Sequence, residues 1–327
     1  MTERMDYAAA ILSGFEYLLN TYPEVLVIGQ GVWSPWYVGK TMTDLDKKFG
    51  RTRVIDTPVS EWATTSAAVG AGLNGLKPIV VHPRMDFMIL ASDSLVNQAA
   101  KWRHMLGGQT SSAVTVRGII NRGGEQGAQH SQALQSWYAH IPGLRVVMPA
   151  TAADARDLLI GAVLSPDPVL YIDDRWLYEL EDNLAPPAPV DLAGLKNQVL
   201  REGDAITIAG TSWGTHLAQQ AAEALASDGI AAEVVDCRVL NPFDGAPLIE
   251  SVRKTGRLLA VDGSWATCGV SAEILARAAE GVIHSAWRAA PRRICLPDAP
   301  APSSNPLEKA YYPTPTQIAD AARAMIG

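Results

Sequence analysis

The side chain with the clearest chemical potential in this sequence is the carboxylate of Glu61. It follows the β-branched run 54–57 and opens the stretch 63–72, which consists mostly of small residues. No Lys or Arg lies within four residues of it, so burial would raise its pKa and let it hold or share a proton near neutrality. The alternative is an exposed first-turn acid, which a helix N-terminus favours after a cap such as Ser60. The local sequence leaves both interpretations open.

A second candidate is His130, which lies in the glycine-rich stretch 123–132 among polar residues. Nothing in this stretch is apolar enough to belong to a core. It follows a predicted strand at 114–120, and the carboxyl ends of parallel strands are where such sheets hold their ligands. An exposed loop histidine is the alternative interpretation.

A third candidate is Ser212, in the sequence Gly-Thr-Ser-Trp-Gly. A predicted strand precedes it and a predicted helix follows, which is the context of a hydrolase nucleophile, with Asp262 and His284 downstream in hydrolase order. A tight turn at the start of a second α/β domain explains the same pattern. A serine hydrolase therefore stands as an alternative from another class.

Short apolar runs rich in β-branched residues alternate with helix-like stretches along the whole chain. We expect strands at residues 25–29, 54–57, 78–82, 114–120, 145–148, 169–173, 205–209, 232–239, 257–261 and 293–296. We expect helices at residues 7–20, 63–73, 92–105, 152–164, 215–227 and 271–280. Strands that are apolar on both faces and alternate with helices predict parallel sheets covered on each side. The Pro-rich segment 183–190 is typical of a linker, so we predict two α/β domains, at residues 1–186 and 187–327.

Composition narrows the class of protein. With 327 residues, 48% hydrophobic and 19% charged, the chain has the composition of a globular protein. A net charge of −7 argues against nucleic acid as a partner. Cys237, Cys268 and Cys295 are widely spaced and odd in number, which predicts reduced thiols rather than disulfides or a metal site. We expect no signal peptide, no membrane span and a cytoplasmic location.

Taken together, several segments resemble the β subunit of the E1 component of 2-oxo acid dehydrogenase complexes. That subunit is the pyrimidine-binding half of the transketolase-like thiamine diphosphate enzymes. The segments that carry the resemblance are 55–61 (Ile-Asp-Thr-Pro-Val-Ser-Glu), 67–78, 97–101, 127–132, 141–149 and 235–244. The resemblance spans nearly the whole chain, and it implies a pyrimidine-binding domain followed by a transketolase C-terminal-like domain.

The resemblance also implies roles for particular residues. Glu61 would hydrogen-bond N1′ of the cofactor's aminopyrimidine and so promote removal of the thiazolium C2 proton. Phe87 would lie against the aminopyrimidine ring, and His130 would orient or protonate the bound substrate. The candidates for the substrate channel are His82, Arg84, Asp86 and Gln129.

One family motif is missing from this chain. The diphosphate-binding half of such enzymes carries Gly-Asp-Gly and a later Asn, which hold Mg²⁺ and the diphosphate, and no Gly-Asp-Gly occurs here. The resemblance therefore implies that a separate α subunit completes the site for thiamine diphosphate and Mg²⁺, in an α2β2 heterotetramer or similar assembly. The implied reaction is decarboxylation of a 2-oxo acid and transfer of the acyl or aldehyde unit, with a lipoyl-bearing transacylase as a further candidate partner. The alternatives are half of a two-component transketolase and a non-catalytic scaffold subunit.

The sequence departs from the family pattern at three places. Gln30 stands where E1 β subunits commonly have Glu, so an acidic relay is not expected. Ser165 and Pro166 replace an acidic turn that helps some relatives bind potassium, so we expect no potassium site. The run 82–86, His-Pro-Arg-Met-Asp, replaces an apolar-aromatic run near the cofactor. This more polar run indicates a substrate other than pyruvate or a branched-chain oxo acid.

Overall fold

A computed structural model describes residues 2–327. The chain divides into two compact units. The first contains the residues up to 122 together with 137–195, and the second contains 123–136 together with 196–327. The boundary proposed from sequence, at 186/187, lies within the tail of the first unit. The glycine-rich loop, although it follows a strand of the first unit, belongs to the second.

Six parallel strands form the sheet of the first unit, in the order β6-β7-β5-β4-β2-β3. Their bounds are β2 Val25–Gln30, β3 Val54–Thr57, β4 Lys77–His82, β5 Thr115–Ile120, β6 Arg145–Val147 and β7 Val169–Asp174. Every residue of β5 and β7 is buried, as expected for strands covered on both faces. A separate antiparallel pair is formed by β1 (Glu3–Asp6) and β8 (Glu181–Leu184).

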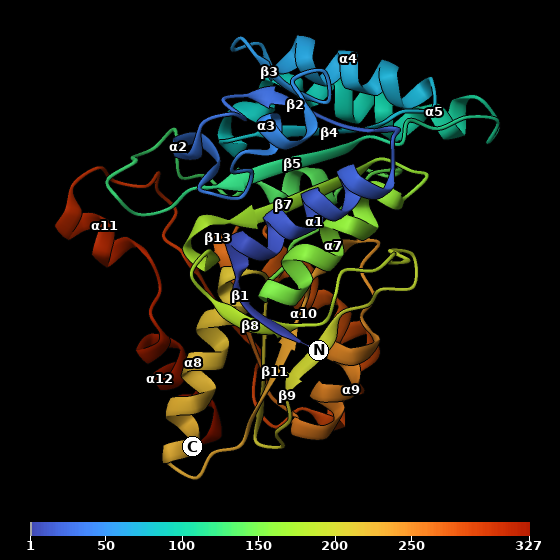
Figure 1. The fold of residues 1–327 in the computed structure, drawn as a ribbon. Coiled ribbons are helices and arrows are strands. Elements are labelled where there is room, and N and C mark those ends of the chain that lie inside the picture. The colour runs from blue at the N-terminus through green and yellow to red at the C-terminus, as the bar shows by residue number, and fades with distance from the viewer. Residues whose placement is uncertain (1) are drawn as a thin grey trace. The chain divides into compact units, whose positions relative to one another are not determined.

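Helices cover both faces of this sheet (Figure 1). In Figure 1, α1 (Tyr7–Thr21) and α7 (Ala152–Leu164) lie side by side on one face, while α4 (Glu61–Leu73) and α5 (Ala100–Met105) lie on the other. The remaining helical segments are α2 Pro35–Val38, α3 Leu45–Phe49, the 3₁₀ helices η1 Met85–Ala91 and η3 Arg175–Leu177, the π-helical η2 Ser94–Ala99, and α6 Gln135–Ala139 at the border of the units.

Local chemistry explains where the main helices of the first unit lie. The side chain of Asp6 accepts a hydrogen bond from the N–H of Ala9 at 2.7 Å and so caps α1, and Thr151 caps α7 in the same way. In α4, the small residues allow close packing. A Cβ added to Gly72 would stand 2.7 Å from the hydroxyl oxygen of Ser112. The small-residue helix thus packs directly against the segment that leads into β5.

The second unit has a five-stranded sheet in the order β14-β13-β10-β11-β9, parallel except for β9. Its strands are β9 Gln198–Arg201, β10 Ile206–Gly210, β11 Ala232–Asp236, β13 Leu258–Trp265 and β14 Arg292–Leu296, and the short β12 is Val239–Asn241. Its helical segments are α8 Trp213–Ser227, α9 Ala246–Thr255, α10 Val270–Gly281, η4 His284–Ala286, α11 Asn305–Tyr311 and α12 Pro315–Ile326.

The predicted fold class, two parallel-sheet α/β domains, is confirmed. Strand 54–57 and helix 152–164 have the predicted bounds. The expected helix at 92–105 is instead a π-helical segment followed by α5. The expected linker was wrong at its start, because Asn183 and Leu184 pair with β1. The predicted strand 232–239 is interrupted at Cys237 and Arg238, which separate β11 from β12.

Candidate active site

The carboxylate of Glu61 is presented at the first position of α4, directly after β3 and its connecting turn. The side chain is half-buried, and within residues 2–327 it forms no ion pair and no side-chain hydrogen bond. Ser60 occupies the cap position, but its side chain makes no capping bond to the helix. The strand that leads into this helix is joined to the segment after β2. Asp56 of β3 accepts hydrogen bonds from the N–H groups of Gly31 at 2.5 Å and Val32 at 3.2 Å. The carboxylate of Glu61 is therefore available to bind a ligand, and hydrogen bonds hold the strand that precedes it in place.

An exposed aromatic ring lies on the helical segment packed against α4. Phe87 belongs to η1, which follows β4 and packs on α4, and 36% of Phe87 is exposed. Large aromatic side chains usually bury more of their surface in a core. An acid and a flat apolar ring thus stand on neighbouring elements at the carboxyl end of the sheet, where α/β proteins bind ligands.

Beneath this surface, His82 ends β4 and is 3% exposed. Its Nε2 shares a hydrogen bond of 3.1 Å with the hydroxyl of Thr65, which lies one turn after Glu61 in α4. Burial lowers the pKa of His82 from 6.5 to about 4. The imidazole is consequently neutral at pH 7 and ties β4 to α4 without adding a charge.

Arg84 and Asp86, the other two polar residues of the run 82–86, differ in how deeply they are buried. Asp86 is buried at 4% exposure, whereas Arg84 is half-buried. Arg84 donates to the carbonyl of Pro83 at 3.0 Å, and its own carbonyl accepts from the N–H of Phe87 at 3.2 Å. Burial lowers the pKa of Arg84, and the charge of Arg175 lowers it further. The like charges of Arg84 and Arg175 therefore act on each other, and Arg84 directly precedes η1, the segment that carries Phe87.

A buried ion pair joins the two neighbouring strands β5 and β7 of the same sheet. Arg117 in β5 donates two hydrogen bonds to the carboxylate of Asp173 in β7, at 2.8 and 2.7 Å, and both side chains are fully buried. Arg117 also donates to Thr41 and to the hydroxyl of Tyr178, which in turn donates to Asp173 at 2.6 Å. Burial is the largest single influence and lowers the pKa of Arg117, but the charge of Asp173, its hydrogen bond to Arg117 and the neighbouring tyrosines together outweigh it, so the pKa of Arg117 is raised. The network fastens the segment around Thr41 to the sheet.

His130 and Gln129 lie in the second unit, on the loop 123–136. His130 is half-buried and Gln129 is exposed. The loop is held within its own unit, because the N–H of Glu125 donates to Glu308 at 3.1 Å and Gln135 donates to Asp262 at 3.2 Å. His130 therefore stands on an anchored loop.

The residues of the hydrolase alternative do not form a triad. Ser212 lies in the β10–α8 turn at φ 49° and ψ −119°, and its hydroxyl is buried without a hydrogen-bond partner among the described residues. The carboxylate of Asp262 accepts from Gln135, from Ser264 and from the N–H of Ser271. His284 is exposed on η4 and forms no hydrogen bond with either residue in the part of the chain that is described.

Within residues 2–327, no group of three or more His, Cys, Asp or Glu side chains is arranged to hold a metal ion. In the same range, every helix is too short or too polar to cross a membrane. Cys237, Cys268 and Cys295 form no disulfide with one another in the described part of the chain.

Two α/β units of this kind are matched by two family models, which place the chain in the transketolase class. The family model "Transketolase, pyrimidine binding domain" matches residues 3–179, and "Transketolase, C-terminal domain" matches 195–318. A solved structure described as a split-gene transketolase, inactive β4 tetramer, has the same fold with a TM-score of 0.75. It shares 21% identity and covers 98% of this chain and 96% of its own.

Curated relatives narrow the class further. The β subunit of acetoin:2,6-dichlorophenolindophenol oxidoreductase from Cupriavidus necator is 36% identical, covering 99% of this chain and 98% of the relative. The pyruvate dehydrogenase E1 β-1 subunit of Arabidopsis thaliana is 37% identical, covering 98% and 88%. The corresponding β subunit of Saccharomyces cerevisiae is 35% identical, covering 97% and 88%. The chain belongs to the family of E1 β subunits of thiamine diphosphate-dependent 2-oxo acid dehydrogenases.

The structure groups Glu61, His82 and Phe87 on elements that contact one another, α4, β4 and η1. Sequence reasoning missed Thr65, which hydrogen-bonds His82, and Arg175, which begins η3 beside the substrate-channel candidate Arg84. Nothing in the sequence marked Thr65, since it is one of several small residues in α4. Arg175 was weakly marked in the sequence by its position directly after the two acids that end β7.

Proposed function

We propose that this chain activates thiamine diphosphate in a two-component 2-oxo acid dehydrogenase, with Glu61 as the activating acid. The observation that carries the proposal is the availability of this carboxylate at the start of α4. The residues present suit the aminopyrimidine end of the cofactor, because the carboxyl group of Glu61 can share a proton with a ring nitrogen and Phe87 offers a flat apolar face. When bound, thiamine diphosphate supplies a carbon nucleophile that attacks the 2-oxo group.

The chain's own residues divide the work in this proposal. Glu61 holds or shares a proton at N1′ of the aminopyrimidine, and Phe87 keeps the ring oriented. Beneath Glu61 and Phe87, the neutral side chain of His82 connects β4 to α4 through its hydrogen bond with Thr65. His130 orients or protonates the substrate, since an imidazole can change its protonation state near neutral pH. Mg²⁺ and the diphosphate are held by the Gly-Asp-Gly motif of an α partner, in an α2β2 assembly located in the cytoplasm.

The test of Glu61 is the substitution Glu61→Gln in the assembled enzyme. The amide retains hydrogen-bonding capacity but cannot share a proton in the same way, and loss of an acid-base partner typically lowers the rate about 10²–10⁴-fold. Exchange of the cofactor's C2 proton, followed by NMR, measures activation without any substrate. The exposed Glu280→Gln serves as the matched control and should exchange normally. Wild-type exchange in Glu61→Gln would refute the assignment.

This chain contains no Gly-Asp-Gly motif, so its binding of thiamine diphosphate should depend on the α partner. This dependence can be tested separately. We expect calorimetry to detect thiamine diphosphate binding with Mg²⁺ only when the α partner is present. Micromolar binding by the isolated chain would contradict the division of the site.

A further inference from the structure

We infer that Glu125 and Glu308 are positioning residues for His130, because together they hold the loop that carries this histidine against α11. This inference rests on the proposed function and names what fixes the imidazole that acts on the substrate. All the residues involved belong to the second unit, which contains the loop 123–136 as well as residues 196–327. Neither glutamate contacts the cofactor in the proposed reaction, so both act through His130.

Hydrogen bonds between the loop and α11 run in both directions. The N–H of Glu125 donates to the carboxylate of Glu308 at 3.1 Å. In return, the carboxylate of Glu125 accepts from the N–H of Asn305, the first residue of α11, at 2.9 Å. Ser304 occupies the cap position of α11 but makes no side-chain capping bond, so the acid of the loop supplies a bond that the cap residue does not. We call these two hydrogen bonds the loop clasp.

The backbone of Glu125 has a conformation that needs support. Its φ of 59° lies in the left-handed region, which glycine adopts readily and other residues rarely do. Gly123, Gly124 and Gly127 around it have φ values of 71°, 65° and 71°. A glutamate thus stands in a run of residues where glycine is the unstrained choice. The side chain that a glycine would lack is the one that binds α11, and this bond offers a physical reason for the strain.

The side chain of Glu308 is directed to the loop. It is 5% exposed, and among the described residues its Oε1 has no hydrogen-bond partner, while its Oε2 accepts from the loop. Burial of a carboxylate is unfavourable unless hydrogen bonds or cations compensate it. Here the compensating donor is a backbone N–H of the loop. The presence of an acid at this position of α11 is therefore explained by its bond to Glu125.

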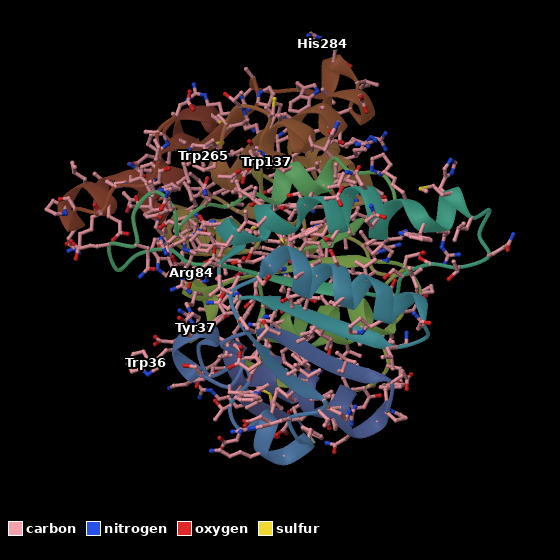
Figure 2. The ribbon with its side chains drawn as sticks, turned by 90° about the horizontal axis from the view of Figure 1, so that it is seen from above. Trp36, Tyr37, Arg84, Trp137, Trp265 and His284 are labelled. Carbon is pink, nitrogen blue, oxygen red and sulfur yellow. The ribbon has the colours of Figure 1, made fainter. Side chains whose placement is uncertain are left out.

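The helix α11 is itself fastened to the sheet of the second unit. The hydroxyl of Tyr311, the last residue of α11, donates to the carbonyl of Ala299 at 2.6 Å. The same hydroxyl accepts from Nε1 of Trp265, which ends β13, at 3.1 Å. Figure 2 shows Trp265 on the same side of the second unit as α11. The loop clasp therefore joins the loop to β13 through α11.

The other end of the loop is tied to the same strand. Gln135 donates to the carboxylate of Asp262 in β13 at 3.2 Å. His130 lies midway between Glu125 and Gln135 in the sequence, so it is held from both sides. Without the clasp, the histidine would be held from the Gln135 side alone. Its imidazole would then occupy a wider range of positions relative to the substrate.

The main test replaces Glu308 in the enzyme assembled with its α partner. Glu308→Leu removes the acceptor of the loop clasp, whereas Glu308→Gln keeps an acceptor oxygen. Turnover is followed as CO₂ release with ferricyanide as electron acceptor, and the donor is whichever of pyruvate, 2-oxobutyrate and 2-oxoglutarate wild type turns over fastest. We expect Glu308→Leu to lower kcat about 10- to 100-fold, since a displacement of about 1 Å can cost about 10²-fold in rate. Glu308→Gln and the control Glu280→Leu, at an exposed position of α10, should behave as wild type.

Two measurements separate this effect from a loss of folding. Exchange of the cofactor's C2 proton should keep the wild-type rate in Glu308→Leu, because Glu61 rather than His130 activates the cofactor in the proposed function. Glu125→Gly removes the other bond of the clasp, and glycine suits the left-handed backbone there. This variant should therefore fold normally and lose kcat to a similar extent. Wild-type kcat in both Glu308→Leu and Glu125→Gly would overturn the inference.

A double-mutant cycle tests whether the clasp acts through the histidine. We expect Glu308→Leu to lower kcat in the wild-type background but to cause no further loss when it is combined with His130→Ala, because the group that the clasp positions is then absent. Equal losses in the two backgrounds would show that Glu308 acts independently of His130 and would overturn its positioning role.

Hydrogen exchange followed by mass spectrometry examines the loop in the assembled enzyme without any turnover. Peptides from the loop 123–136 should exchange faster in Glu308→Leu and Glu125→Gly than in wild type, because each variant lacks one bond of the clasp. Unchanged exchange would overturn the clasp. Faster exchange in the variants, together with no turnover of any 2-oxo acid by wild type, would overturn the proposed function and leave the clasp as the support of the loop.

Discussion

Replacing His82 with glutamine should remove a large part of the loss of stability that the chain suffers in mild acid. In the folded chain, burial lowers the pKa of this histidine from 6.5 to about 4. Between these two values the unfolded chain binds a proton that the folded chain does not, so the stability is complete above pH 6.5 and declines as the pH falls toward 4. At about 1.4 kcal/mol for each unit of pKa, the full shift corresponds to about 3.5 kcal/mol, which is lost completely only below pH 4.

Urea unfolding followed by tryptophan fluorescence measures this effect, with wild type and His82→Gln compared between about pH 7.5 and pH 4.5. Glutamine retains a polar group for Thr65 and does not titrate. Since only the part between pH 6.5 and pH 4.5 falls within this range, we expect the free energy of unfolding of wild type to fall by about 2.5 kcal/mol more than that of the variant. His104→Gln, a substitution at an exposed position of α5, should follow wild type. Parallel curves for wild type and His82→Gln would refute the argument that a buried neutral imidazole joins β4 to α4.

Two further predictions concern the other unit and the sheet interior. His130→Ala should leave cofactor affinity and C2-proton exchange near normal in the assembled enzyme, while turnover falls by about 10²-fold or more. The reason is that the imidazole acts on the substrate rather than on the cofactor. Steady-state kinetics like those of wild type would show that His130 has no role in the reaction. Arg117→Met should destabilise the chain by about 3–5 kcal/mol in urea unfolding, because it leaves the charge of Asp173 buried and unpaired. The double variant Arg117→Met/Asp173→Leu should recover much of that loss, and no recovery would mean that packing dominates.

Much of this protein follows from local sequence. A β-branched run, a cap residue, an acid and a small-residue stretch are sufficient to predict β3, α4 and the position of Glu61 between them, because strand and helix preferences act over a few residues. Apolar strands alternating with helices likewise predict parallel sheets. The short strands β1 and β8 escaped prediction, since each is only four polar-rich residues long and forms by pairing with a segment distant in the chain.

Only the tertiary structure decided the electrostatic character of the site. From sequence, the run 82–86 adds charge near the cofactor, but burial against Thr65 makes His82 neutral. The sequence also places Arg84 and Arg175 about ninety positions apart, and the sheet order brings their charges together. The physical reason is that secondary structure depends on neighbours in the chain, whereas desolvation and charge pairing depend on neighbours in space.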